Sequence, residues 1–210
     1  MELYDINKFS EEKLYFKEEP FGSLMQKRIK DILLICSKYD EFLLEVDGRI
    51  DEQIFQEYVA LSIRYPPQFT QVSNQEEAFE ALRSKSFDLI ITMVNLGDIM
   101  PFELAEMINS EFPDIPIVVL THFSREVSKF IADKNTEHID YVFSWLGDSS
   151  IMLAIIKLIE DKMNVDHDVG EVGSNCIILV EDSIRYYSSY LPSMYKILFH
   201  QTRDLMSEGL

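Results

Sequence analysis

The stretch that decides the fold runs from residue 87 to residue 121 and reads FDLIITMVNLGDIMPFELAEMINSEFPDIPIVVLT. Apolar runs at 88–94 and 116–121 flank a segment, 102–111, whose pattern is helical. Strands of a parallel sheet have this unbroken apolar character because helices cover both faces of the sheet. The stretch therefore predicts a strand–helix–strand unit with a right-handed crossover.

The same alternation continues on both sides of this unit. The expected strands elsewhere lie at 32–36, about 68–72 and 139–144, and the expected helices at 50–63, 75–84, 124–134 and 149–163. Five strand–helix alternations predict an α/β domain with a doubly wound, five-stranded parallel sheet. Its functional pocket is expected at the carboxyl ends of the strands.

The two ends of the chain differ from this regular part. We expect a polar helical leader over 1–30, the α/β domain over 31–163 and a linker over 164–174, which is acidic and contains two glycines. Residues 175–210 then read as the first strand and helix of a truncated second unit, with the strand at 176–180. One strand and one helix cannot bury their apolar surface alone, so we expect docking on the first domain or on another chain, such as a second copy.

Composition excludes several classes of function. The net charge is −18, with 37 acidic and 19 basic residues, which disfavours nucleic acid and anionic membranes as partners. No apolar stretch reaches the roughly 18 residues of a membrane span, and the N-terminus does not resemble a secretion signal. Two distant cysteines form neither a disulfide framework nor a zinc pattern, so we expect a cytoplasmic protein.

Three segments resemble response-regulator receiver (CheY-like) domains of two-component signalling. FDLIITMVNLGDIM at 87–100, IPIVVLTHFS at 115–124 and DYVFSW at 140–145 look like the third, fourth and fifth strands of such a domain. IILVEDS at 177–183 looks like the first strand of another receiver. The resemblance implies a flavodoxin-like fold and a site with a phosphoacceptor Asp, an acidic pair that holds Mg²⁺, a Lys and a switch hydroxyl.

The chemistry of that site is missing from the first domain. Met93 stands at the acceptor position, Cys36 and Ser37 replace the acidic pair, and Ser144 stands where the Lys is expected. A thioether offers no oxygen nucleophile, and neutral side chains neither hold Mg²⁺ nor neutralise a phosphoryl group. The losses at three strand ends predict a pseudo-receiver with no catalytic residue and no cofactor.

Some features of the receiver site remain. Thr121 matches the switch hydroxyl and Tyr141 the aromatic residue of the fifth strand, so both are switch or interface candidates. Trp145 either contributes to a partner surface or fills the space of the missing phosphoryl group. Tyr187 and Tyr190 on the C-terminal helix are further interface candidates.

Three other residues each have two interpretations. Asp98 is either a displaced phosphoacceptor or, as we favour, a turn former. Cys36 is either a redox-active thiol or a buried, inert one, and we favour the second because no basic residue adjoins it. His122 is either a metal ligand or a loop residue, and it lacks a partner at metal-ligand spacing.

A broader resemblance covers nearly the whole chain after residue 30. DEFLLEVDGRID, ITMVNLGD, VFSWLGD, ILVEDSIRYYSSYLPSMY and RDLMSEGL resemble the N-terminal regulatory region of large bacterial proteins. Those proteins carry tandem receivers ahead of a part that resembles phosphoenolpyruvate synthase or pyruvate phosphate dikinase. The resemblance implies a non-enzymatic input module that contacts protein partners or downstream domains. In the alternative, a second receiver completed beyond residue 210 takes part in a phosphorelay, with Glu181 and Asp182 as half of its Mg²⁺ site.

Overall fold

The structure is a computed structural model that describes residues 25–45, 49–61, 63–94, 99–122 and 137–207. Its elements are β1 (Asp31–Ile35), α1 (Lys38–Leu44), α2 (Ile50–Ala60), β2 (Gln68–Val72), α3 (Gln75–Ser84), β3 (Leu89–Met93), α4 (Pro101–Glu111), β4 (Ile117–Thr121), β5 (Tyr141–Ser144), α6 (Ser150–Gly170) and α7 (Ile184–Ser207). Three predictions lie outside the described residues: the leader up to residue 24, the helix at 124–134 and the role of Asp98.

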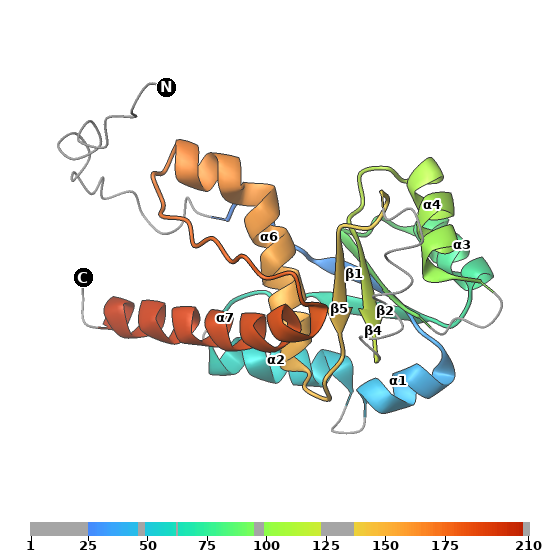
Figure 1. Ribbon diagram of the computed structural model, residues 1–210, viewed down its shortest axis with the longest axis horizontal. Helices are drawn as coiled ribbons and strands as arrows, with labels where there is room; N and C mark the ends of the chain where they lie inside the picture. Colours follow the sequence, from blue (N-terminus) through green and yellow to red (C-terminus); the bar gives the residue numbers. More distant parts are fainter. Residues whose placement is uncertain (1–24, 46–48, 62, 95–98, 123–136, 208–210) are drawn as a thin grey trace.

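The five strands form one parallel sheet in the order β2-β1-β3-β4-β5 (Figure 1). This is the flavodoxin-like, doubly wound order, so the predicted fold class is confirmed. The register pairs Ile35 with Thr92, Met93 with Leu120, and Thr121 with Ser144. The carboxyl ends of β1, β3, β4 and β5 therefore meet at one edge of the sheet.

Helices cover both faces of the sheet. Alternate residues of a strand point to opposite faces, so Leu33 and Ile35 pack with α3 and α4, while Ile32 and Leu34 pack with α2 and α6. Figure 1 shows α3 and α4 together on one side of the sheet and α6 on the other. This double cover explains why β3 and β4 are buried at every position.

The sequence specifies the starts of several helices locally. The Asn74 side chain accepts the Glu77 N–H at 2.9 Å, and Glu77 accepts the Ser73 N–H, so α3 begins with a capping box. Pro101 occupies the first turn of α4, where a missing N–H costs nothing. Helix α1 was not predicted, although Ser37 caps it in the same way as Asn74 caps α3.

The C-terminal part corrects two predictions. Helix α6 does not end at 163 but continues through Gly170, so most of the predicted linker over 164–174 is helical. Its added turns are held by contacts between Asn164 or Asp168 and the segment 25–27. The expected strand at 176–180 has an extended backbone but pairs with no described strand, and its apolar side chains are exposed.

Helix α7 packs on the first domain, which is one of the two expected docking sites. Leu191 and Tyr195 join the core cluster around α6, and the helix lies against β5 (Figure 1). Pro192 lies inside the helix without ending it. The assignment of 175–210 to a second unit stays a prediction. Within the described part of the chain, no helix has the length and apolarity that a membrane crossing requires.

Candidate functional site

Four strands bring the predicted receiver-site positions together at the carboxyl edge of the sheet. Cys36, Met93, Thr121 and Ser144 are all buried there, each at or just after the end of its strand. The Cys36 N–H bonds to the Val72 carbonyl oxygen at 3.0 Å, so the chain leaves β1 still attached to β2. These four side chains offer a thiol, a thioether and two hydroxyl groups, and none is a carboxylate or an amine.

The Cys36 thiol is unsuited to nucleophilic chemistry. Burial raises the pKa of Cys36 to about 12, and the carboxylates of Glu41, Asp40 and Glu45 add to the rise. The thiol therefore stays protonated at neutral pH, and the protonated form is a poor nucleophile. This supports the interpretation of Cys36 as a buried apolar side chain rather than a redox centre.

A chain of polar groups lies beside Cys36. The Ser37 hydroxyl donates to Asp40 Oδ2 at 2.8 Å, and the Asp40 N–H donates to Ser37 Oγ at 3.1 Å. His122 Nε2 lies 3.1 Å from Asp40 Oδ1. Because a buried carboxylate only accepts hydrogen bonds, this arrangement assigns a proton to Nε2. The Asp40 side chain is 1% exposed, so its two hydrogen bonds replace water.

Sequence reasoning did not identify Asp40, and it treated His122 as a loop residue. A local signal existed, because Ser37 and Asp40 have the spacing of a helix-capping pair. The contact between Asp40 and His122 spans 82 residues and joins helix α1 to the residue that follows β4. Only the fold brings these two residues together.

A cavity of about 340 Å³ opens at this edge of the sheet. Its lining residues come from the α1 and α2 helices and the loops after β4 and β5: Leu43, Leu44, Gln53, His122, Trp145, Gly147 and Ser149. The Trp145 N–H donates to the Thr121 carbonyl oxygen at 2.6 Å, which fixes the loop after β5 to the end of β4. Trp145 thus forms part of the wall of a cavity near the carboxyl ends of β4 and β5.

The outer edge of β5 is closed by side chains of α7. The Ser144 N–H donates to Ser188 Oγ at 2.9 Å, and the Tyr187 hydroxyl donates to the Val142 carbonyl oxygen. The Tyr187 and Phe143 rings meet edge to face with centroids 5.3 Å apart. A sheet edge covered in this way cannot pair with another strand.

The other interface candidates have different surroundings. Tyr190 is 48% exposed and stacks on Tyr186, with ring centroids 6.1 Å apart. Tyr141 is half-buried, and the Lys162 ammonium lies 5.5 Å from its ring centroid. Of the predicted interface candidates, Tyr190 therefore faces solvent, whereas Tyr187 contacts β5.

The acidic pair Glu181 and Asp182 lies just before α7. Glu181 Oε1 accepts the Ser183 N–H at 3.0 Å, a local contact at the start of the helix. Within the described ranges, no group of three or more His, Cys, Asp or Glu side chains could hold a metal ion. The four buried side chains at the strand ends include no carboxylate of the kind that holds Mg²⁺ in a receiver, and both oxygens of Asp40, near Cys36, are hydrogen-bonded.

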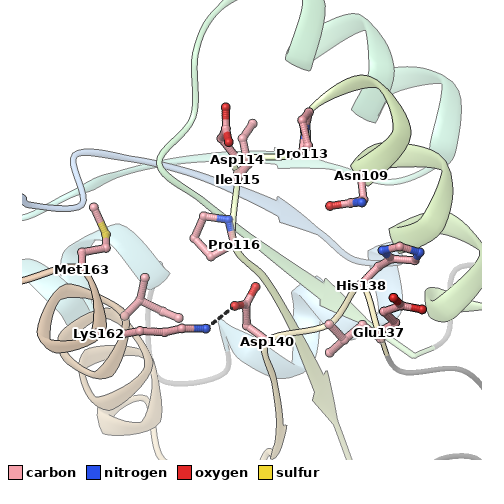
Figure 2. Close-up of a pocket in the computed structure, with 12 residues that line it drawn as sticks. Asn109, Pro113, Asp114, Ile115, Pro116, Glu137, His138, Asp140, Lys162 and Met163 are labelled. Carbon is pink, nitrogen blue, oxygen red and sulfur yellow. Dashed lines mark hydrogen bonds and ion pairs between the residues drawn. The ribbon is translucent and has the colours of Figure 1, made fainter.

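A second cavity, of about 430 Å³, lies at the opposite edge, where β4 and β5 begin (Figure 2). The Lys162 Nζ atom contacts Asp140 Oδ1 at 2.6 Å, and this bond raises the pKa of Lys162. Asp140 Oδ2 accepts the Ile117 N–H at 3.0 Å. The charged pair thus ties α6 to the start of β4 and serves the fold.

Several solved structures of receiver domains are similar to this chain. The signal receiver domain of an HD domain-containing protein from Pseudomonas fluorescens Pf-5 is 19% identical, with 65% of this chain and 90% of that chain covered and a TM-score of 0.45. The response regulator TrrA from Thermotoga maritima, in complex with Mg²⁺-BeF, is 20% identical, with 62% and 99% covered and a TM-score of 0.46. The phosphorylated cyanobacterial phytochrome response regulator RcpA is 23% identical, with 63% and 92% covered and a TM-score of 0.45.

Similarity at this level says nothing about activity, and the fold assignment rests on the strand order itself. No protein-family model matches the sequence, and no curated protein matches it.

Proposed function

We propose that the chain is a non-catalytic regulatory module: a pseudo-receiver that acts in the cytoplasm through contacts with protein partners or with other domains of its own polypeptide. One observation carries this proposal. The fold keeps the carboxyl edge at which a receiver works, but Cys36, Met93 and Ser144 supply no acceptor, metal ligand or cation there. Burial of all three side chains supports a structural role for them.

An exposed apolar surface supports the part of the proposal that concerns contacts. It consists of the extended segment before α7 and the outer side of that helix: Ile177, Ile178, Leu179, Val180, Tyr186, Tyr190, Ile197 and Leu198. Side chains on both faces of 177–180 are exposed, which is unusual for four consecutive apolar residues. A strand in the middle of a parallel sheet needs such cover on both faces.

The partner that fits this surface best is a second α/β unit that takes 176–180 into its sheet. That unit is the second receiver-like domain expected from IILVEDS, in a larger protein of the phosphoenolpyruvate synthase type. A homodimer through the same surface is the competing arrangement. A longer chain that includes the second unit should protect the amides of 177–180 from hydrogen exchange. A homodimer of the 210-residue chain should protect them only at high protein concentration.

Phosphorylation chemistry provides the direct test of the pseudo-receiver. The 210-residue chain is incubated with acetyl phosphate and Mg²⁺ beside an active receiver domain, and intact mass is recorded for both. The chain should gain no phosphoryl group while the active receiver does. A phosphorylated chain would overturn the proposal, and peptide mapping would then examine Asp98 first.

The phosphorelay alternative makes a different prediction with the same assay. If the second unit is an active receiver that uses Glu181 and Asp182 to hold Mg²⁺, only a chain extended beyond residue 210 should be phosphorylated. Replacing Asp182 by Asn in that longer chain should then abolish the modification. In either case, removing 31–163 from the full-length protein should alter its regulation and leave its intrinsic catalytic rate unchanged.

A further inference from the structure

The segment 25–29, which we call the strap, lies antiparallel to the C-terminal half of α6. Every second backbone amide of the strap donates to a side chain of the helix, and the acceptors are spaced four residues apart. The bonds join Ile29 N–H to Glu160 Oε1 (3.0 Å), Lys27 N–H to Asn164 Oδ1 (2.8 Å), and Met25 N–H to the two oxygens of Asp168 (3.2 and 3.3 Å).

The spacing of these bonds has a geometric basis. Four residues of an α-helix advance about 6.0 Å, and two residues of an extended chain advance about 6.6 Å. The two repeats nearly coincide, so one row of helical side chains can bond to alternate amides of a chain that runs along the helix. The strap follows this spacing although it bends at Lys27 and Met25 has a φ of 50°. Asn164 Nδ2 also donates to the Lys27 carbonyl oxygen at 2.7 Å, which makes this contact two-sided.

One acceptor of the strap belongs to a buried ion pair. Glu160 Oε2 lies 2.7 Å from Lys157 Nζ, and the two side chains are 2% and 3% exposed. A carboxylate at this depth needs all its hydrogen bonds, because water cannot replace a lost donor. The Ile29 N–H and the Lys157 ammonium are therefore both needed as partners of the buried Glu160 side chain.

The same ion pair reaches α7 on its other side. The Lys157 ammonium lies 5.9 Å from the ring centroid of Phe199 in α7 and 5.0 Å from that of Tyr58 in α2. A cation over an aromatic face is held more strongly when it is desolvated. Lys157 thus contacts the helix that closes the β5 edge, and its charge partner contacts the strap.

We propose that the strap and α7 are energetically coupled through the Lys157–Glu160 pair, so that detaching the strap loosens α7 from the edge of β5. The N-terminal segment is then an input site and α7 the responding element. This route of regulation requires no phosphoryl group, and it holds whether or not a second receiver is phosphorylated. Each detached element leaves the buried pair less well satisfied, which makes the other element easier to detach.

Residue-resolved amide exchange on the full 210-residue chain tests the coupling. Replacing Asn164 by Ala removes the two-sided strap contact and the bond from Asn164 Nδ2 to the Glu160 carbonyl oxygen, and it leaves the Lys157 and Glu160 side chains in place. Exchange should accelerate at the strap amides and also at the Ser144 N–H, which Ser188 of α7 protects. The exchange rate of the Ser144 amide should rise by roughly 2-fold to 150-fold, which is the range that the usual interaction energies between coupled residues give. Exchange in α3 should not change.

The coupling must also act in reverse. Replacing Phe199 by Ala should also accelerate exchange at the Lys27 and Ile29 amides, because linkage between two sites is reciprocal. Ile197, which is 56% exposed on the same helix, provides the matched control. The variant Ile197→Ala should leave the strap amides unchanged.

A neutral replacement of the ion pair tests the route. In the double variant Lys157→Met/Glu160→Gln, the amide oxygen still accepts the Ile29 N–H, but the charged link to α7 is gone. Asn164→Ala in this background should then leave Ser144 exchange unaltered. Should Asn164→Ala fail to fold, Asp168→Ala removes the Met25 bonds together with the local contact between His167 Nδ1 and Asp168 Oδ1, and it allows the same comparison. An unchanged Ser144 amide in the single variants, or coupling that survives the double replacement, would refute the proposal.

Discussion

Replacing Ser188 by alanine removes the acceptor that closes the edge of the sheet. Ser188 Oγ accepts the Ser144 N–H at 2.9 Å, and both residues are buried. Alanine leaves a cavity smaller than a water molecule, so the amide of Ser144 has no substitute acceptor. The structural change is thus confined to one unsatisfied backbone donor in the last residue of β5.

The expected loss follows from that single donor. A buried donor without a partner costs about 1–3 kcal/mol. For a domain of this size, each kcal/mol lowers the melting temperature by roughly 2–4 °C. Urea denaturation and thermal unfolding, both followed by circular dichroism, measure the two quantities. The exchange rate of the Ser144 amide identifies the group responsible.

The adjacent Ser189 provides a matched control, because the same substitution is made one residue away at an exposed position. Ser189→Ala should change stability by less than about 0.5 kcal/mol. If Ser188→Ala and Ser189→Ala are equally stable, or if Ser144 exchanges at the same rate in both, α7 does not close the edge of β5.

Three further predictions concern accessibility, pH and the exposed segment. At neutral pH a thiol reagent should label Cys176, which is exposed, and leave Cys36 unmodified until the protein is denatured. The variant Cys176→Ser retains Cys36 as its cysteine, so rapid labelling of this variant in the folded state would contradict the prediction. Burial raises the pKa of Cys36 and Tyr187 to about 12, so the folded state retains protons that the unfolded chain loses near their ordinary values of 9.0 and 10.0. The free energy of unfolding should therefore be highest below pH 9 and decrease as the pH rises towards 12. Urea midpoints measured from pH 8 to pH 11 test this, and in Tyr187→Phe they should decrease less at the upper end of that range. Val180 is 89% exposed, so Val180→Asp should change the free energy of unfolding by less than about 0.5 kcal/mol. The same variant should weaken binding of the partner that covers 177–180. A strong loss of stability would show instead that the segment is packed in the isolated chain.

The central part of the fold was predictable because its signals are local. Apolar runs predicted β1, β3 and β4, the repeat of the strand–helix unit predicted β2 and β5, and the alternation of strands with helices predicted a parallel sheet. Helix α1 was missed because it is short and carries exposed apolar residues, Tyr39 and Phe42, with no clear amphipathic pattern. Its capping serine was the local signal that would have identified it.

The C-terminal errors have a different origin. Residues 164–170 are polar because they bind the strap rather than because they form a linker. Residues 176–180 have the sequence of a central strand, but a strand needs neighbours, and β5 is already closed by α7. In both places the local sequence was interpreted without knowledge of which segments lie beside it.

By itself, the sequence determined the sheet and its carboxyl edge, because apolar strands alternate with helical segments along the chain. The loss of receiver chemistry stays a prediction from the residue types at the strand ends. The tertiary structure alone decided the contacts between distant segments. These contacts join His122 to the buried Asp40, α7 to β5, and the strap to α6. Each joins polar groups far apart in the chain, and such groups are recognised as partners only when burial removes the water that would otherwise satisfy them.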